Sequence, residues 1–443
     1  MNSRQLSLLL VFAGLLPGAP IPQVSYSKDV APILNKYCQS CHRAGEIGPM
    51  QLLTYEQVRP WAKAIRNAVI KKTMPPWDAD SRYGHFQNDR SMRDQEIQTV
   101  VAWVDQGAQG DAAEIRKPQQ FTDGWQIGKP DVIFEMPKEF QVPATGTVGY
   151  KWIKIPSGFT EDKWVVACEV RPGNRSIVHH AVVYAREPEV PYAKDAPYGE
   201  FFELTLESFR GLSRKNKMFS AEWEPEHLQV YAPGSNPLEL GPGQARLVRA
   251  GADIIFEMHY TPNGKPEADR TQVGLIFAKR PPNERVKEFR TGRSDLAIPP
   301  GEANYARESH IEVMKDLKLV AFMPHMHLRG KAMEFSATYP DGSKEVLLSV
   351  PRYRFQWQMT YQLKEPKLLP KGTILHCAAV YDNSVNNPHN PDPKATVKNG
   401  RQSWEEMMAG FFDVAIEPAV EVGELFRDAV SGDNSRPQSA PSQ

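Results

Sequence analysis

The chain has 443 residues, too many for one hydrophobic core, and this length predicts two or three domains. Hydrophobic residues make up 41% and charged residues 24%, as in ordinary globular proteins, while 38 prolines favour short strands and turns over long helices. Lysine plus arginine equals aspartate plus glutamate at 53 each, so the charge gives no reason to expect nucleic acid or an anionic membrane as a partner.

The first 20 residues have the pattern of an export signal. Arg4 precedes the apolar run LSLLLVFAGLL at residues 6–16, and small or turn-forming residues follow at 17–20. The run is shorter than the roughly 20 apolar residues that cross a bilayer, and no later segment is apolar enough. We therefore expect a signal peptide at residues 1–20, no stable membrane span and a periplasmic or extracellular protein; an uncleaved anchor is the alternative.

Residues 25–111 have the apolar spacing of helices. The spacing predicts three helices, over Ser27–Tyr37, Thr54–Lys72 and Asp94–Gln106. Ser27 is expected to cap the first helix, and Gly107 is expected to end the third. Three such helices around the short motif at residues 38–42 predict a small all-α domain.

The period changes after a polar linker at residues 112–130. Short β-branched and aromatic runs now alternate with Pro, Gly and Asn turns, and strands are expected at Trp164–Val170, Asp253–Tyr260, Leu317–Met323 and Thr373–Tyr381. The spacing predicts two all-β, sandwich-like or jelly-roll domains at residues 131–295 and 296–425. The composition of residues 426–443 predicts a disordered tail.

Cys38, Cys41 and His42 form the CxxCH pattern of c-type haem attachment. Two thiols bond to the two vinyl groups of one porphyrin, and the adjacent histidine reaches the iron. Met74 is the expected second axial ligand, and His85 is the alternative. A zinc site would need two more ligands nearby, and a redox disulfide would need a βαβ context. The segment resembles class I-type cytochrome c domains and predicts one covalently bound haem c.

Five further histidines stand in three strand-like runs: His179 and His180 in SIVHHAVV, His259 in IIFEMHY, and His325 and His327 in MPHMHLRG. Alternation places His259 on the face opposite Phe256 and Met258, so it is not expected to fill the core. His325 and His327 share one strand face and can bind one ion. The adjacent pair His179 and His180 would point to opposite faces unless the backbone bulges there.

The ordered set of ligands resembles the copper type II, ascorbate-dependent monooxygenases, the peptidylglycine and dopamine hydroxylating enzymes. His-His, a single His, HxH and then the Glu406–Met407 pair carry the resemblance, which covers Thr147–Ile416. It implies two copper ions on two packed β-sandwich domains. One copper, which transfers electrons, would be bound by His179, His180 and His259. The other, which binds dioxygen, would be bound by His325, His327 and Met407, with Met408 as the alternative to Met407.

The resemblance implies an enzyme that hydroxylates a C–H bond with O₂. Three positions depart from the peptide-amidating enzymes, since Met323 replaces an arginine, and Ala409 and Phe411 replace an asparagine and a tyrosine. Those groups grip a substrate carboxylate, so a small, apolar substrate is expected here. The two remaining cysteines, Cys168 and Cys377, are expected to be free and buried.

The fused haem suggests that an external electron donor replaces ascorbate and reduces the copper at His179, His180 and His259 through the haem. Two alternatives remain at this point: a haem and copper electron-transfer protein without monooxygenase activity, and a non-catalytic binding module. Four other histidines are expected to be ordinary surface or strand residues: His227, His310, His376 and His389.

Overall fold

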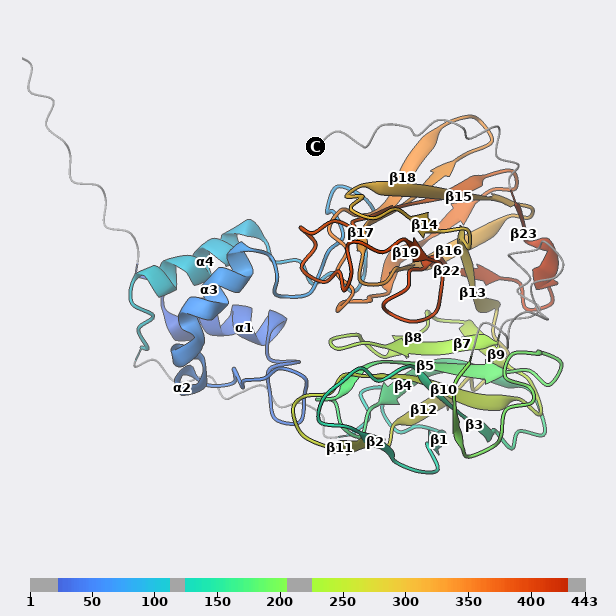
Figure 1. Ribbon diagram of the computed structural model, residues 1–443, viewed down its shortest axis with the longest axis horizontal. Helices are drawn as coiled ribbons and strands as arrows, with labels where there is room; N and C mark the ends of the chain where they lie inside the picture. Colours follow the sequence, from blue (N-terminus) through green and yellow to red (C-terminus); the bar gives the residue numbers. More distant parts are fainter. Residues whose placement is uncertain (1–22, 112–123, 205–224, 429–443) are drawn as a thin grey trace, which may run out of the picture.

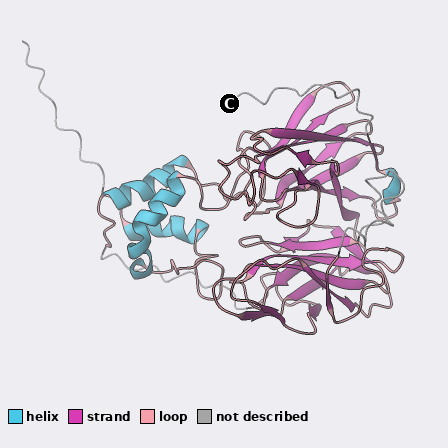
Figure 2. Ribbon diagram, in the orientation of Figure 1, coloured by secondary structure: helices cyan, strands magenta, loops and turns pink. Residues whose placement is uncertain are grey.

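The computed structural model describes residues 23–111, 124–204 and 225–428. The expected signal peptide and most of the expected linker and tail lie outside these residues. The structure is 39% strand and 11% helix (Figure 2). None of the helices in the described ranges is long and apolar enough to cross a membrane. The domain limits inferred from the sequence stay predictions.

The first β-sandwich packs two sheets around one apolar core. One sheet has the order β6 (Phe201–Phe202), β3 (Lys151–Pro156), β10 (Asp253–Tyr260), β5 (Val178–Arg186) and β7 (Glu226–Tyr231). The facing sheet contains β1 (Val132–Glu135), β12 (Gln272–Phe277), β4 (Lys163–Arg171) and β9 (Gln244–Val248), with β8 (Leu238–Glu239) beside β4, and β2 (Phe140–Val142) pairs separately with β11 (Glu267–Asp269). Cys168 and Leu275 meet Val183 and Phe256 in the core between the sheets.

The second β-sandwich repeats this arrangement. One sheet has the order β18 (Lys344–Val350), β17 (Gly330–Thr338), β20 (Ile374–Tyr381), β15 (Tyr305–Val313) and β23 (Phe426–Asp428). It faces β13 (Glu284–Arg293), β22 (Met408–Ile416), β16 (Leu317–His325) and β19 (Tyr361–Leu369), and β14 (Ala297–Ile298) pairs separately with β21 (Val397–Lys398). A short parallel pairing of β9 with β13 joins one sheet of each sandwich into a single nine-stranded sheet (Figure 1).

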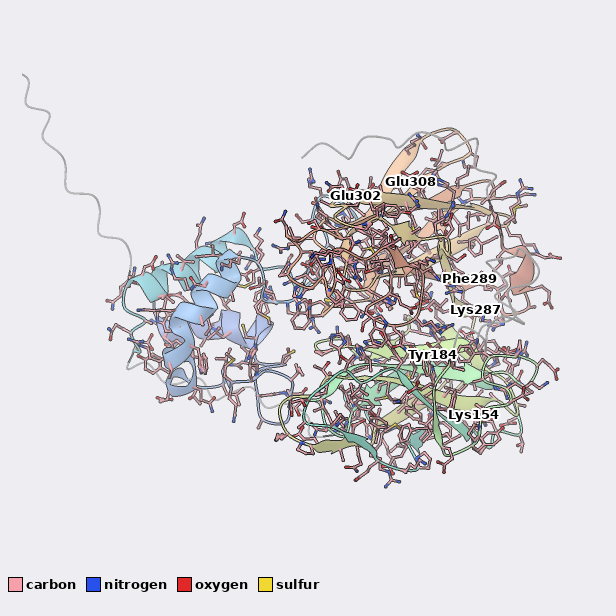
Figure 3. The ribbon with its side chains drawn as sticks, in the orientation of Figure 1. Lys154, Tyr184, Lys287, Phe289, Glu302 and Glu308 are labelled. Carbon is pink, nitrogen blue, oxygen red and sulfur yellow. The ribbon has the colours of Figure 1, made fainter. Side chains whose placement is uncertain are left out.

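Buried ion pairs hold the two sandwiches face to face. Glu226 of β7 accepts a 2.8 Å hydrogen bond from Lys287 of β13, and Arg246 of β9 donates to Asp413 of β22 at 2.8 Å. Lys287 and Tyr184 lie on the facing sides of the two sandwiches (Figure 3). Removing one partner of a buried pair leaves an uncompensated charge, so this network disfavours other placements of the sandwiches.

The region before the sandwiches is not the small all-α domain that the sequence predicts. Its helices gather at one end of the molecule (Figure 1), but they are short: α1 (Ala31–Tyr37), α2 (Tyr55–Val58), α3 (Ala62–Ile70) and α4 (Asp94–Asp105), with single turns η1 (Tyr26–Val30) and η2 (Arg59–Trp61). Ser25, and not Ser27, caps the first turn, because its Oγ accepts from the Lys28 N–H at 3.1 Å.

The stretch between α3 and α4 explains why the predicted fold class is wrong. It leaves the helices and packs on the second sandwich, where Trp77 lies 4.9 Å from the Tyr361 ring and Phe86 forms a β-bridge with Leu363. Trp77 is buried within the core of that sandwich. The helices therefore do not close a core of their own around this stretch, and the protein is a mostly β protein with a few short helices.

Glu96 is the basis of a pH-dependent prediction. Burial alone raises the pKa of this carboxyl, but hydrogen bonds from Arg93 and Tyr37 outweigh burial and lower the pKa to about 2. Because the folded pKa lies below the unfolded value of about 4.3, the carboxylate stabilises the fold above pH 4, and this contribution is lost as the pH falls towards 2. We expect Glu96→Gln to lower the free energy of unfolding by roughly 1–3 kcal/mol at pH 7.

Denaturant unfolding at pH 7, 4 and 2 measures this effect. The wild type and Glu96→Gln should converge near pH 2, and Glu365→Gln, an exposed position on β19, should match the wild type throughout. An equal loss of stability at pH 2 and pH 7 would show that the charge of Glu96 is not responsible.

Candidate metal centre

Three histidine rings converge where β5 pairs with β10. His259 lies opposite His180 and Tyr260 lies opposite Val178, so His179 has no cross-strand partner and forms a β-bulge. The bulge turns two adjacent side chains to the same side, although a flat strand would point them apart. The Nδ1 atom of His180 lies 3.1 Å from Nδ1 of His179 and 3.3 Å from Nδ1 of His259.

The three rings fit a transition-metal ion. Four nitrogens placed about 2.0 Å from a tetrahedral metal lie about 3.3 Å apart, close to the spacing seen here. A neutral imidazole nitrogen has one proton or one lone pair, so Nδ1 of His180 cannot satisfy both neighbours by hydrogen bonding. Burial lowers the pKa of His179 to about 4 and that of His259 to about 3, which keeps both rings in the neutral form that binds metals.

Among the described residues, this is the one group of three or more His, Cys, Asp or Glu side chains whose ligand atoms meet. The alternation expected along β10 is confirmed: Phe256 and Met258 lie in the core, and His259 lies on the other face. There the Tyr150 ring stacks on His259 at 4.6 Å. The His259 ring therefore lies outside the hydrophobic core between the two sheets.

His325 and His327 form a second group at the end of β16. Their ring centroids are 5.2 Å apart. Nδ1 of His325 lies 2.7 Å from Oε1 of Gln358, and Nδ1 of His327 lies 3.2 Å from the carbonyl oxygen of Glu405. Both oxygens only accept, so each Nδ1 carries the proton and each Nε2 keeps a lone pair for a metal. Burial lowers the pKa of His325 to about 4 and holds that of His327 well below its usual value.

Strand pairing indicates the face on which Met407, the residue before β22, lies. His325 of β16 lies opposite Ala409 of β22, so alternation places Met407 on the strand face of His325. Met408 is 3% exposed and lies in the core of the second sandwich. The geometry therefore favours Met407 over Met408 as the sulfur ligand.

Glu406 ties the loop after β16 to the start of β22. Its fully buried carboxylate accepts backbone N–H bonds from His327 at 2.9 Å, Arg329 at 2.6 Å and Met407 at 3.1 Å. Burial raises its pKa to about 7, against the opposing effect of these bonds. The sequence marks Glu406 only as part of a Glu-Met pair, whereas in the structure its carboxylate holds the backbone of both His327 and Met407.

One aromatic ring lies between the two histidine groups. Phe355, in the loop of residues 351–360 between β18 and β19, stacks on His179 at 5.1 Å between centroids. The same ring lies 6.1 Å from His327 at an interplanar angle of 78°. Phe355 is 7% exposed, so its ring excludes water from the space between the two histidine groups. Sequence reasoning missed Phe355 because its contacts join two sandwiches and no motif marks it.

Gln358 is expected to set the copper affinity of the second group. Gln358→Leu keeps the size of the side chain but removes the acceptor that orients His325, and loss of such a partner weakens metal binding about 10- to 100-fold. Competition titration with a copper chelator measures the affinity. Gln358→Glu keeps an acceptor and is expected to stay near the wild type. Equal affinities for all three proteins would show that the contact does not orient the ligand.

The structure places the expected haem residues in the turn after α1. The His42 N–H donates to the Cys38 carbonyl at 2.9 Å, so the motif forms a helical turn. Nδ1 of His42 lies 3.2 Å from the Met50 carbonyl oxygen, which leaves Nε2 free for an iron. Cys38 and Cys41 are free, half-buried thiols. These features fit covalent haem attachment.

The two candidates for the second axial ligand lie in different places. Met74 lies four residues after the end of α3, and its N–H bonds weakly to the Ala68 carbonyl at 3.5 Å. His85 lies along β19, where its carbonyl accepts from the Lys364 N–H at 2.8 Å. The assignment of Met74 as the second axial ligand stays a prediction.

Two segments contact the sandwiches near the histidine groups. One is the haem turn, the turn after α1 that contains Cys38, Cys41 and His42, and the other is the stretch after α3. Glu46, four residues after His42, forms an ion pair with Arg175, which lies in the turn before β5. Arg354, next to Phe355, donates to Asp78 at 2.8 Å and to the Thr73 carbonyl at 3.1 Å. One loop thus contacts both histidine groups and the segment that carries Met74.

The remaining histidines and cysteines lie outside these groups. His310 and His376 pair across β15 and β20, and Thr338 completes their hydrogen bonding. Cys168 and Cys377 are free and fully buried in different sandwiches, which confirms the expectation for both thiols.

No family model and no curated protein matches the chain. Among solved structures, T=1 particles derived from infectious bursal disease virus match with 9% identity over 67% of this chain and 72% of theirs, at a TM-score of 0.19. A VP2 subviral particle of the same virus matches with 10% identity over 70% and 76% of the two chains, at a TM-score of 0.19. Similarity at this level carries no argument about fold or function.

Proposed function

We propose that this protein is an exported copper monooxygenase that carries a covalent haem and hydroxylates a C–H bond of a small, mainly apolar molecule with O₂. One observation carries the proposal: two largely buried groups of histidines face the same Phe355 ring at the interface of two β-sandwiches. Structural histidines do not need converging ring nitrogens that hydrogen bonds cannot satisfy.

Each group has ligands suited to copper. His179, His180 and His259 would hold one ion, and His325, His327 and Met407 would hold the other. Imidazole with thioether suits an ion that changes between Cu(I) and Cu(II). When bound, the two ions supply one-electron chemistry and the reduction of dioxygen. The chain orients His325 through Gln358 and His327 through the Glu405 carbonyl, and burial keeps bulk water away.

The surroundings of His325 support an apolar substrate. Met323 of β16 lies opposite Phe411 of β22, and both side chains share the strand face of His325. The Phe411 ring lies 6.2 Å from the His325 ring. An apolar neighbour at this point favours a hydrocarbon group over a charged one next to the ligand.

The proposed haem would be held by Cys38, Cys41 and His42 and reduced by an external electron donor. The ion pair between Glu46 and Arg175 supports passage of electrons to the group at His179, because it brings the haem turn against the first sandwich near β5. No residue of the described chain is needed as an acid or base in this scheme.

A haem and copper electron-transfer protein without oxygenase activity is the second candidate. Its support is the Phe355 ring, which fills space between the two histidine groups where a substrate could otherwise lie. An electron relay needs such a dry, short path and no room for substrate.

Haem and copper content of the exported protein is the deciding experiment, followed by substrate-dependent O₂ consumption. We expect one covalent haem and two copper ions, and O₂ uptake that depends on an apolar substrate. Two coppers without any oxygen uptake across a substrate screen would favour the electron relay. Absence of copper binding would rule out both candidates.

A further inference from the structure

A cleft opens where the stretch before α4, the first sandwich and the second sandwich meet. It measures about 700 Å³, including the part open to solvent. Met323 and Met359 contribute to its apolar wall. Met323 stands two residues before His325 on the same strand face, and Met359 follows Gln358, which contacts His325. The strand and the loop that carry His325 and Gln358 therefore also line the cleft.

All but one of the charged side chains that line the cleft contact a group of opposite type within the chain. Arg246 donates to Asp413 at 2.8 Å, and His227 forms an ion pair with Glu288. Arg90 forms no ion pair with any carboxylate in the ranges that the structure describes. Arg90 is thus the cation of the cleft that has no carboxylate partner among the described residues.

Arg90 is partly buried beside groups that do not cancel its charge. Its Nη2 donates to the Asn236 side-chain oxygen, and its guanidinium also lies against the Cys41 sulfur. Burial lowers the pKa of this guanidinium. Withdrawing a cation from water without a counter-ion costs free energy, and a bound anion would offset that cost.

The backbone holds Arg90 at the cleft. Phe86 forms a β-bridge with Leu363 of β19, and the Asn88 side chain donates to the Thr360 carbonyl at 2.7 Å and accepts from the Gln362 N–H at 3.1 Å. This pairing carries the chain along β19 towards Met359. The arginine is therefore presented on a fixed backbone and not on a free loop.

We propose that Arg90 binds the carboxylate of an apolar carboxylic acid in this cleft. The planar guanidinium can bind a carboxylate through two parallel hydrogen bonds, and the methionine wall receives the apolar part. Two sources have this chemistry: a free small molecule, which includes the substrate, and a propionate group of haem attached at Cys38 and Cys41. The second source rests on the proposed function, whereas the first does not.

Calorimetric titration of the full chain with octanoate tests the free-ligand source. We expect octanoate to bind the wild type, and Arg90→Leu to weaken that binding at least about tenfold. Octanol, which lacks the charge, should bind no better to the wild type than to the variant. Arg82→Leu is the matched control, because Arg82 is exposed and pairs with Asp80 in the same stretch.

The midpoint potential of the attached haem tests the other source. Removing a cation beside a haem carboxylate disfavours the reduced form, so Arg90→Leu should lower the reduced-to-oxidised ratio about tenfold, or 59 mV. An Arg90-dependent change in either measurement supports the proposal and identifies the source. If octanoate binding and the potential are both insensitive to Arg90→Leu, the proposal is overturned. If no haem is attached, octanoate alone decides, and only the haem part of the proposed function has failed.

Discussion

The His327→Ala protein should bind one copper ion fewer than the wild type and lose oxygen-dependent hydroxylation by more than about 100-fold, the upper effect expected for losing a partner outside the ligand set. His327 is 1% exposed, and its Nδ1 is engaged with the Glu405 carbonyl, so Nε2 is the nitrogen left to bind a metal. Alanine removes that nitrogen and leaves His325 and Met407 with too few partners for the ion. Copper content by elemental analysis and initial rates of O₂ uptake measure the two effects.

His310→Ala is the matched control, since His310 lies in a strand of the same sandwich and pairs with His376 away from both groups. It should retain two copper ions and wild-type activity. Full copper content in His327→Ala would show that the second ion, if present, is held elsewhere. Loss of both coppers with loss of folding would be recognised by a changed unfolding temperature and resolved with His327→Gln.

Alternation along single strands made part of the site predictable. The strand expected at residues 253–260 is β10 with the same bounds, and the predicted face of His259 is confirmed. The alternation of side chains between the two faces of a strand is a local property, so the sequence of eight residues suffices. The position of one ring on the non-core face follows from that rule alone.

The convergence of His179 with His180 was not predictable from their own run. The bulge arises from pairing with β10, where His259 opposes His180 and Tyr260 opposes Val178, nearly eighty residues further along the chain. A register shift depends on the partner strand and not on the bulged residues. Local reasoning could therefore state the need for a bulge but could not place one.

Contacts across domains were also missed or misread. The loop of residues 351–360 has no motif, yet Phe355, Gln358 and Arg354 contact both histidine groups and the stretch after α3. The same kind of contact explains why the predicted all-α domain is wrong, because Trp77 is buried by the second sandwich and not by helices. Apolar spacing shows that a residue is buried, but it does not show what buries it.

Glu406→Ala is expected to destabilise the second sandwich by roughly 3–9 kcal/mol, because it leaves three buried backbone N–H groups without an acceptor at about 1–3 kcal/mol each. Those N–H groups belong to His327, Arg329 and Met407, so the change also frees two of the proposed copper ligands. The loss is a large part of the 5–15 kcal/mol by which native proteins are stable. Thermal unfolding and copper content measure it.

Glu406→Gln separates positioning from folding. Its amide oxygen can still accept N–H bonds from the loop, whereas its amide group meets a donor, so a folded protein with weakened copper binding at this group alone is expected. Glu345→Ala, an exposed ion-pair partner of Lys367 in the same sandwich, should change stability by no more than about 1 kcal/mol. If Glu406→Gln bound copper as the wild type does while Glu406→Ala only unfolded more easily, Glu406 would support the sandwich without positioning His327 and Met407.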